Sequence, residues 1–191
     1  MDAPSRYPSN SALQLKVTLL GVKPPIWRRI LVPASIALPG LHRVFQVVMG
    51  WEDSHLHAFE IKKKRYVMAG VDEWDDSPYE LSEDGVKIAK LVEVGDTFVY
   101  LYDFGDDWRH LVVVEAISSA GRALVHASCL GGERACPPED VGGTPGYYYF
   151  LQAISDPSHE EHEDYLEWAE DGFDPEAFNL ADLNARLQRL R

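Results

Sequence analysis

Cysteine is scarce in this chain: among 191 residues, only Cys129 and Cys136 carry a thiol. Two cysteines are too few for a scaffold held together by disulfides, so an oxidising compartment is a poor fit. Residues 1–10 are polar and lack the apolar stretch of a signal peptide. No apolar run approaches the roughly 20 residues that a membrane-spanning helix needs. We therefore expect a cytoplasmic protein with no membrane segment.

Basic residues are missing from one long stretch. Between Arg134 and Arg186 the sequence has neither lysine nor arginine, and the same interval holds 13 of the 31 acidic residues. These acids are Glu139, Asp140, Asp156, Glu160, Glu161, Glu163, Asp164, Glu167, Glu170, Asp171, Asp174, Glu176 and Asp182. The other 18 acids equal the 18 basic residues, so the C-terminal third carries the whole net charge of −13. Such a surface argues against tight DNA binding, while it keeps the protein dissolved or attracts a basic partner.

Flexible linkers and internal repeats are also absent, so the sequence gives no reason to divide the chain into several domains. Apolar residues make up 46% of the sequence, which is enough for one sizeable core. We predict a disordered tail over residues 1–11, followed by a single domain over residues 12–191.

The residue patterns in most of the first two thirds of the chain predict β-strands. Every second residue from 13 to 19 is apolar, which predicts a strand with one buried face, and a second strand follows at residues 26–32. Between Pro39 and Gly50 the spacing becomes helical, with Leu41, Val44, Phe45, Val48 and Met49 on one stripe. Further strands are predicted at residues 58–61, 66–68, 86–88, 97–102, 111–114 and 123–129.

The last third reads as helices. A helix is predicted from Thr144, and Ser158 with Glu161 has the spacing of a capping box that opens another. Asn179 would cap a final helix whose leucines recur at helical spacing. Strands first and helices last, with one early helix, predict an α+β fold with a mostly antiparallel sheet and a helical C-terminal third. The opening strand–strand–helix–strand order is compatible with a β-grasp-like N-terminal half.

Two stretches of unusual composition lie outside this core pattern. Residues 100–110 read Tyr-Leu-Tyr-Asp-Phe-Gly-Asp-Asp-Trp-Arg-His, which predicts a hairpin with an acidic tip and aromatic flanks. Residues 136–147 contain Pro-Pro-Glu-Asp and a Gly-Gly pair. Because one strand and a short loop separate the two stretches, we expect them to form one ligand site. Its candidate residues are Tyr102, Asp103, Asp106, Asp107, Trp108, His110, Glu139, Asp140 and Tyr147.

Several chemistries fit these residues. Oxygen ligands for a hard divalent cation such as Mg²⁺ or Ca²⁺ would come from Asp103, Asp106, Glu139 and Asp140, and His110 would add a base or a further ligand. In the alternative interpretation, aspartate and glycine only make the turn, and Asp103 accepts hydrogen bonds from backbone amides. Zinc is a third option, because Cys129, Cys136, His55 and His57 are suitable ligand types, although the cysteines lack a paired spacing.

A series of separated motifs resembles a known family. The motifs are Pro-Pro-Ile-Trp-Arg-Arg at 24–29, Leu-His at 41–42, Met-Gly-Trp at 49–51, His-Leu-His-Ala-Phe at 55–59, Tyr-Asp-Phe-Gly-Asp-Asp-Trp-Arg-His at 102–110, Pro-Pro-Glu-Asp at 137–140 and Gly-Tyr at 146–147. In this order they resemble the plasmid pRiA4b ORF-3-like family over residues 13–187. The resemblance implies an association with plasmids and insertion sequences, but no established activity. It also implies that other members have cysteine where this chain has Val141, so a cysteine-held metal would lack a ligand here.

Some members of that family carry a transposon-resolvase label, which the residues do not support. Recombination needs a serine or tyrosine nucleophile surrounded by cationic groups, whereas Arg109 is the only lysine or arginine in the hairpin stretch. No nucleophile–base pair can be named. The sequence therefore favours a non-catalytic binding or interaction module for a protein or small-molecule ligand, with a divalent cation as the candidate cofactor. The alternative is a metal-dependent hydrolase that acts on a small or phosphorylated substrate.

Overall fold

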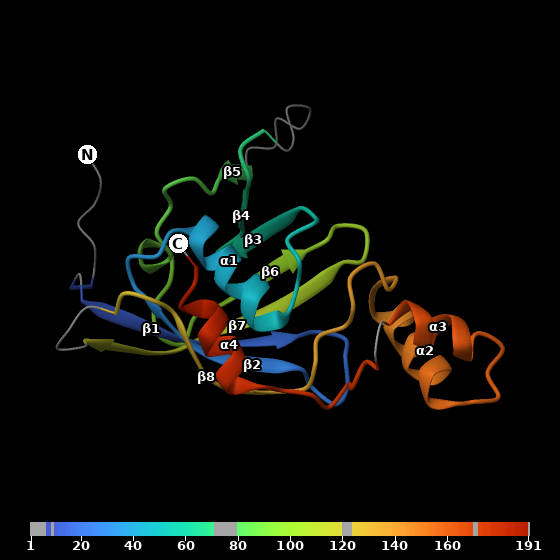
Figure 1. Ribbon diagram of the computed structural model, residues 1–191. Coiled ribbons are helices and arrows are strands. Elements are labelled where there is room, and N and C mark those ends of the chain that lie inside the picture. Colours follow the sequence, from blue (N-terminus) through green and yellow to red (C-terminus); the bar gives the residue numbers. More distant parts are fainter. Residues whose placement is uncertain (1–6, 9, 71–79, 120–123, 170–171, 191) are drawn as a thin grey trace.

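A single mixed sheet forms the centre of the protein. The computed structural model describes residues 7–8, 10–70, 80–119, 124–169 and 172–190. Within these residues it contains eight strands in the order β5-β4-β3-β6-β7-β1-β2-β8 and four α-helices (Figure 1). Neighbouring strands are antiparallel, except for the parallel pair of β4 and β5. The predicted α+β class and mostly antiparallel sheet are confirmed.

The elements have the following bounds. The strands are β1 (Ser11–Leu19), β2 (Trp27–Pro33), β3 (His57–Ile61), β4 (Lys64–Val67), β5 (Glu80–Ser82), β6 (Thr97–Tyr102), β7 (Trp108–Ser119) and β8 (Ser128–Glu133). The helices are α1 (Leu38–Met49), α2 (Gly143–Ser155), α3 (His162–Trp168) and α4 (Leu180–Leu187), with one 3₁₀ turn, η1 (Ile88–Lys90).

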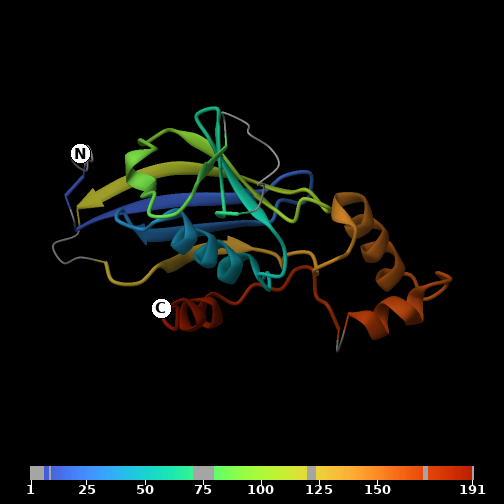
Figure 2. The ribbon, with the colours of Figure 1, turned by 90° about the horizontal axis from the view of Figure 1, so that it is seen from above.

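The core lies between the sheet and helices α1 and α4, which cover the same face (Figure 2). The apolar stripe predicted for the first helix is buried, with Phe45 and Val48 fully so. In β1 the alternation also holds, because its apolar positions are buried and the residues between them are half-buried. Leu183 and Leu187 of α4 are buried in the same core cluster. Period-2 and period-3.6 patterning thus placed the main elements correctly.

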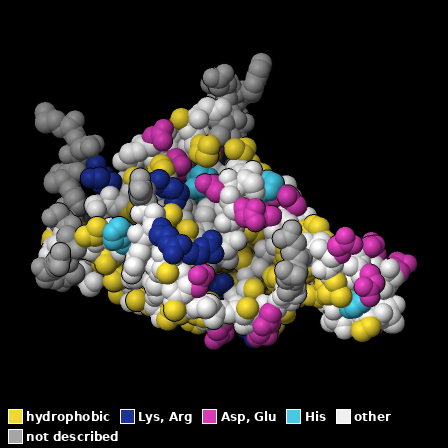
Figure 3. Space-filling view, in the orientation of Figure 1, with side chains coloured by type: hydrophobic (Ala, Val, Ile, Leu, Met, Phe, Trp, Pro, Cys, Tyr) yellow, Lys and Arg dark blue, Asp and Glu magenta, His cyan; other side chains and the backbone are white. Residues whose placement is uncertain are grey.

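Helices α2 and α3 lie beyond one end of the sheet (Figures 1 and 2). Phe150 of α2 is fully buried against Tyr165 and Trp168 of α3. Acidic side chains gather on this projecting part of the molecule (Figure 3). The charge asymmetry of the sequence is therefore also an asymmetry in space.

Several local predictions were wrong. Ser158 does not open a helix: its hydroxyl bonds to Asp156, and α3 begins later, at His162. The strand expected at 123–129 begins at Ser128 instead, and the one at 86–88 is a single bridge followed by η1. The side chains of a short polar motif can hydrogen-bond to each other instead of capping a helix, so the motif alone does not determine where a helix begins. Asn179 does cap α4, as predicted.

Two further predictions fall partly outside the described residues. Most of the tail expected over residues 1–11 lies outside the described residues, although Ser11 is described and already begins β1. Residues 69–84 are polar and acidic, which predicts a surface loop; residues 71–79 lie outside the described part of the chain, and residues 80–82 form β5. Among the described residues, no helix is long and apolar enough to cross a membrane.

Candidate metal centre

The hairpin of β6 and β7 presents Asp103 at its tip. Tyr102 and Trp108 pair across the two strands, so the turn consists of the residues between them. Asp103 has a positive φ of 54°, a conformation that aspartate tolerates better than most residues. Its Oδ1 accepts hydrogen bonds from the amides of Gly105 at 2.8 Å and Asp106 at 3.3 Å. The turn therefore fixes one carboxylate oxygen of Asp103 and leaves Oδ2 for other contacts.

The Pro-Pro-Glu-Asp loop lies directly against this tip. Oδ2 of Asp106 accepts a hydrogen bond from the amide of Gly142 at 3.1 Å. A Cβ atom at Gly143 would lie only 2.7 Å from the carbonyl oxygen of Asp106, so only glycine fits this approach. The two stretches that the sequence singled out are therefore in direct contact.

A third segment, just before β3, completes the arrangement. His57 pairs with Tyr102 in the sheet, and the amide of Asp103 donates to the carbonyl of Leu56 at 2.9 Å. This register places His55 beside the end of β6, where its ring contacts Tyr102 edge to face. The strand register, which no local pattern specifies, thus brings a histidine to the carboxylates.

One nitrogen and three carboxylate oxygens converge at this point. Nε2 of His55 lies 2.9 Å from Oδ1 of Asp140, 3.7 Å from Oδ2 of Asp103 and 3.8 Å from Oε2 of Glu139. The ligand atoms of His55, Asp103 and Asp140 all lie within 4.8 Å of one another, close enough to hold one metal ion. Imidazole and carboxylate together are a common donor set for divalent metals.

The other carboxylate oxygen of Glu139, Oε1, is held in place by hydrogen bonds. Its Oε1 accepts hydrogen bonds from the Tyr102 hydroxyl at 2.9 Å and from the amide of Glu52 at 2.8 Å. The amide of Ser54 donates to the same hydroxyl at 3.1 Å. Burial, together with the Glu139 carboxylate, raises the pKa of Tyr102 to about 12, so this phenol remains a donor at neutral pH. Outer contacts of this kind orient ligands in metal sites.

The atoms that face inward have no such partners. Oε2 of Glu139 and Nε2 of His55 are both buried, and neither makes a hydrogen bond of good geometry within the described part of the chain, although Nε2 lies 2.9 Å from Oδ1 of Asp140. The side chains of Asp103 and Glu139 are only 10% and 14% exposed, whereas that of Asp140 is 72% exposed. The cluster is therefore closed on the protein side and open to solvent at Asp140. Buried polar atoms without partners are costly unless a ligand satisfies them.

The other sequence-predicted site residues lie elsewhere. Asp106 links the hairpin to the loop, and Asp107 is exposed and lies near Arg109. Trp108 is buried and packs against the ring of Trp51. Tyr147 is buried among the aromatic residues of α2, and burial raises its pKa to about 12. These aromatic residues belong to the core.

His110 is also a core residue. Its Nδ1 lies 3.2 Å from the carbonyl oxygen of Tyr100, and Nε2 accepts from the indole nitrogen of Trp51 at 3.4 Å. Complete burial lowers the pKa of His110 to about 4. The alternation of Trp108, His110, Val112 and Val114 along β7 was the sequence signal for this burial.

The cysteines take no part in the cluster. Cys129 and Cys136 are both buried free thiols, and burial raises the pKa of each. Within the described ranges, the histidine that joins the carboxylates is His55, which the sequence had offered only as a zinc ligand beside the cysteines. The mixed histidine–carboxylate set was missed because its members come from three separate segments.

Comparison with known proteins agrees with this architecture. The model of the plasmid pRiA4b ORF-3-like protein family matches residues 11–182. Uncharacterized protein y4hQ of Sinorhizobium fredii is 40% identical over 189 residues, which cover 94% of this chain and 92% of the relative. The crystal structure of a protein of unknown function, MM3350 from Methanosarcina mazei Go1, is 36% identical and superposes with a TM-score of 0.81. The match covers 90% of this chain and 97% of that one. The chain belongs to the plasmid pRiA4b ORF-3-like protein family.

Proposed function

We propose that the protein binds a divalent transition-metal ion at His55, Asp103, Glu139 and Asp140. The observation that carries the proposal is the convergence of Nε2 of His55 with three carboxylate oxygens, two of these side chains being almost fully buried. The ligand atoms of Asp103 and Asp140 lie within 4.8 Å of each other and of Nε2 of His55, and Oε2 of Glu139 lies 3.8 Å from the same nitrogen, so the repulsion among these carboxylates is relieved when a cation neutralises them.

The donor set favours some metals over others. Ca²⁺ and Mg²⁺ prefer sites made of oxygen alone, whereas imidazole suits Zn²⁺ and Fe²⁺, and carboxylates also suit Mn²⁺. His55 therefore shifts the expectation from the hard cations that the sequence suggested towards Mn²⁺ or Zn²⁺. Four protein ligands, one of them exposed, leave room for a further ligand from solvent.

Thermal unfolding with and without metal tests this proposal. The chelator-treated protein should melt at a higher temperature when Mn²⁺ or Zn²⁺ is added, because a ligand at 100 times its Kd stabilises the folded state by about 2.7 kcal/mol. His55→Gln and Asp140→Asn should abolish this shift. Asp107→Asn is the matched control, because Asp107 belongs to the same turn and is exposed.

The metal-free variants separate a ligand role from a structural one. Without metal, Asp140→Asn should melt at the same or a higher temperature than the parent, because one repelling charge is removed. A metal response that persists in both variants would refute the proposal. Variants that lose stability and still bind metal would show that these residues only support the loop.

A metal-dependent hydrolase is the second candidate. A cavity of about 860 Å³ lies beside the cluster and shares His55 with it, which gives a substrate room next to the proposed metal. No nucleophile is assigned. The binding module is preferred, because the ligand geometry alone supports it and needs no reaction.

Three further inferences about the whole chain belong here. We propose that residues 12–191 form one domain, because the core cluster includes residues from β1 to α4. The strand–strand–helix–strand opening supports a β-grasp-like N-terminal half. Two free, buried cysteines support a cytoplasmic location.

A further inference from the structure

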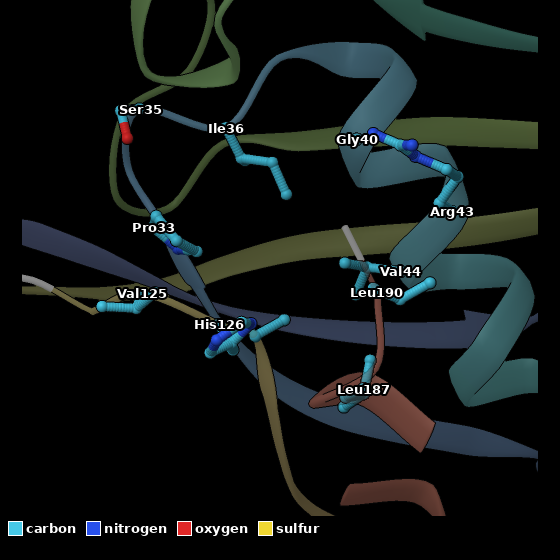
Figure 4. A pocket seen from close by; sticks show the side chains of 11 residues that line it. Pro33, Ser35, Ile36, Gly40, Arg43, Val44, Val125, His126, Leu187 and Leu190 are labelled. Carbon is cyan, nitrogen blue, oxygen red and sulfur yellow. The ribbon is translucent and has the colours of Figure 1, made fainter. Parts of the chain in front are cut away.

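A second, smaller cavity lies between α1, the end of α4 and the segment that precedes β8 (Figure 4). Its volume is about 210 Å³, which is room for about seven water molecules at roughly 30 Å³ each. A ligand of this size has one ring or a short branched chain. The cavity shares no residue with the proposed metal centre, so a molecule bound here lies apart from the metal.

Most of the cavity wall is apolar. Ile36, Val44, Leu187 and Leu190 lie around the hollow in Figure 4. Val44 and Leu187 are buried, whereas Ile36 and Leu190 are half-buried. Val125 also lines the cavity and is 72% exposed, so the cavity opens to solvent on this side. Such a wall favours the apolar body of a small ligand.

The charge of the cavity lining is opposite to that of the whole protein. Its ionisable residues are Arg43 and His126, and neither can carry a negative charge. Among the described residues, no aspartate or glutamate lines this cavity, although the chain has a net charge of −13. The side chain of Arg43 runs back along α1 towards Gly40, which also lines the cavity, as long side chains in helices commonly do (Figure 4). The lining is therefore complementary to an anion.

Arg43 has no carboxylate partner within the described part of the chain. By contrast, ion pairs with glutamate are formed by Arg29, Arg65, Arg109 and Arg134. Arg43 also lines the larger cavity beside the metal centre, but two of the three carboxylates there are bound to histidines instead. A guanidinium that is always charged and has no protein partner can pair with the carboxylate of a ligand.

We propose that this cavity binds a small carboxylate whose apolar body is one ring or a short branched chain, and that Arg43 is the ion partner of the carboxylate. The apolar body lies between α1 and the end of the chain, against Val44, Leu187 and Leu190. Both parts of the ligand are needed, because an ion pair at an exposed arginine contributes little on its own. Burial of the apolar body supplies the remaining affinity.

Benzoate, benzamide and acetate separate the two parts of the ligand. Benzamide has the shape of benzoate without its charge, and acetate has the charge without the ring. NMR titration of the full chain, treated with chelator so that no carboxylate binds a metal, should show benzoate shifting the methyl signals of Val44, Leu187 and Leu190. Benzamide and acetate should each bind at least about fivefold more weakly, because each lacks one of the two favourable contacts. Equal binding of either probe, or the absence of methyl shifts with benzoate, would overturn the proposal.

Two variants that each remove one positive charge locate the carboxylate. Arg43→Gln should weaken benzoate binding about fivefold, to the level of benzamide, and leave benzamide binding unchanged. Arg186→Gln is the matched control, because Arg186 directly precedes Leu187 and is exposed but does not line the cavity. It changes the net charge by the same amount and should leave benzoate binding unchanged. Arg43 is exposed as well, so neither variant should disturb folding. Equal weakening by both variants, or unaltered benzoate binding in Arg43→Gln, would refute an ion pair at Arg43.

Discussion

Replacing Leu187 by alanine should destabilise the whole protein, because this side chain docks the last helix onto the core. Leu187 is 1% exposed. With Leu190, it lines a cavity of about 210 Å³ next to α1, which Val44 and Pro33 also line (Figure 4). Truncation would enlarge a cavity that the surrounding side chains already fail to fill.

The expected cost follows from comparable core truncations. Replacing a buried leucine by alanine costs about 2–5 kcal/mol, and the upper part of this range applies where a site does not collapse. The neighbouring cavity argues for poor collapse, so we expect about 3–4 kcal/mol. For a chain of this length, about 2–4 °C is lost per kcal/mol, which predicts a melting temperature lower by roughly 6–16 °C.

Urea unfolding followed by tryptophan fluorescence measures this change. Leu180→Ala is the matched control, because Leu180 belongs to the same helix but is 38% exposed, and it should cost less than about 1 kcal/mol. A single transition with a lower midpoint in Leu187→Ala would support one cooperative domain. A change below about 0.5 kcal/mol would refute the reasoning, because α4 would then be an independent appendage.

Three other predictions concern the rest of the chain. Gly146→Ala should lower the free energy of unfolding, measured in urea, by about 1–3 kcal/mol, because the new Cβ would lie 1.9 Å from the carbonyl oxygen of Val141. Gly131→Ala, whose Cβ would meet nothing within 4 Å, should cost less. Burial lowers the pKa of His110 from an ordinary 6.5 to about 4, so the unfolded state binds the proton at a higher pH than the folded state does. The free energy of unfolding therefore falls as the pH drops from 6.5 towards 4. Between pH 7 and pH 4.5 the parent protein should lose about 2 kcal/mol more than His110→Phe. Equal losses would contradict this. Duplex DNA should not bind with sub-micromolar Kd at about 150 mM salt in a fluorescence anisotropy titration, because Arg28 is buried against carbonyl oxygens and Arg29 is paired with Glu115.

The elements were predictable where one local pattern decided them. The stripe of α1 and the alternation of β1 reflect burial on one face, so they can be read from the chain alone. The start of α3 could not be read in this way, because Ser158 satisfies its hydroxyl within its own turn. The start of β8 depends on pairing with β2, which is a distant contact.

The candidate site was predictable in part for the same reason. Asp103 and the Glu139–Asp140 pair stood out, because a turn and a loop need fewer acids than they contain. His55 could not be joined to them, since its position depends on the register of β3 against β6. His57 and Glu83, which meet at the neighbouring cavity, come from different strand ends and show no spacing in the sequence.

The most direct test of the metal centre is a crystal structure of the protein grown with Mn²⁺, with data collected to detect its anomalous scattering. The account predicts one strong peak, about 2.0–2.3 Å from Nε2 of His55 and from the inward oxygens of Asp103, Glu139 and Asp140. Asp140→Asn crystals should lose or weaken that peak. Crystals of the parent protein without a peak at His55, or with manganese bound only elsewhere, would contradict the claim.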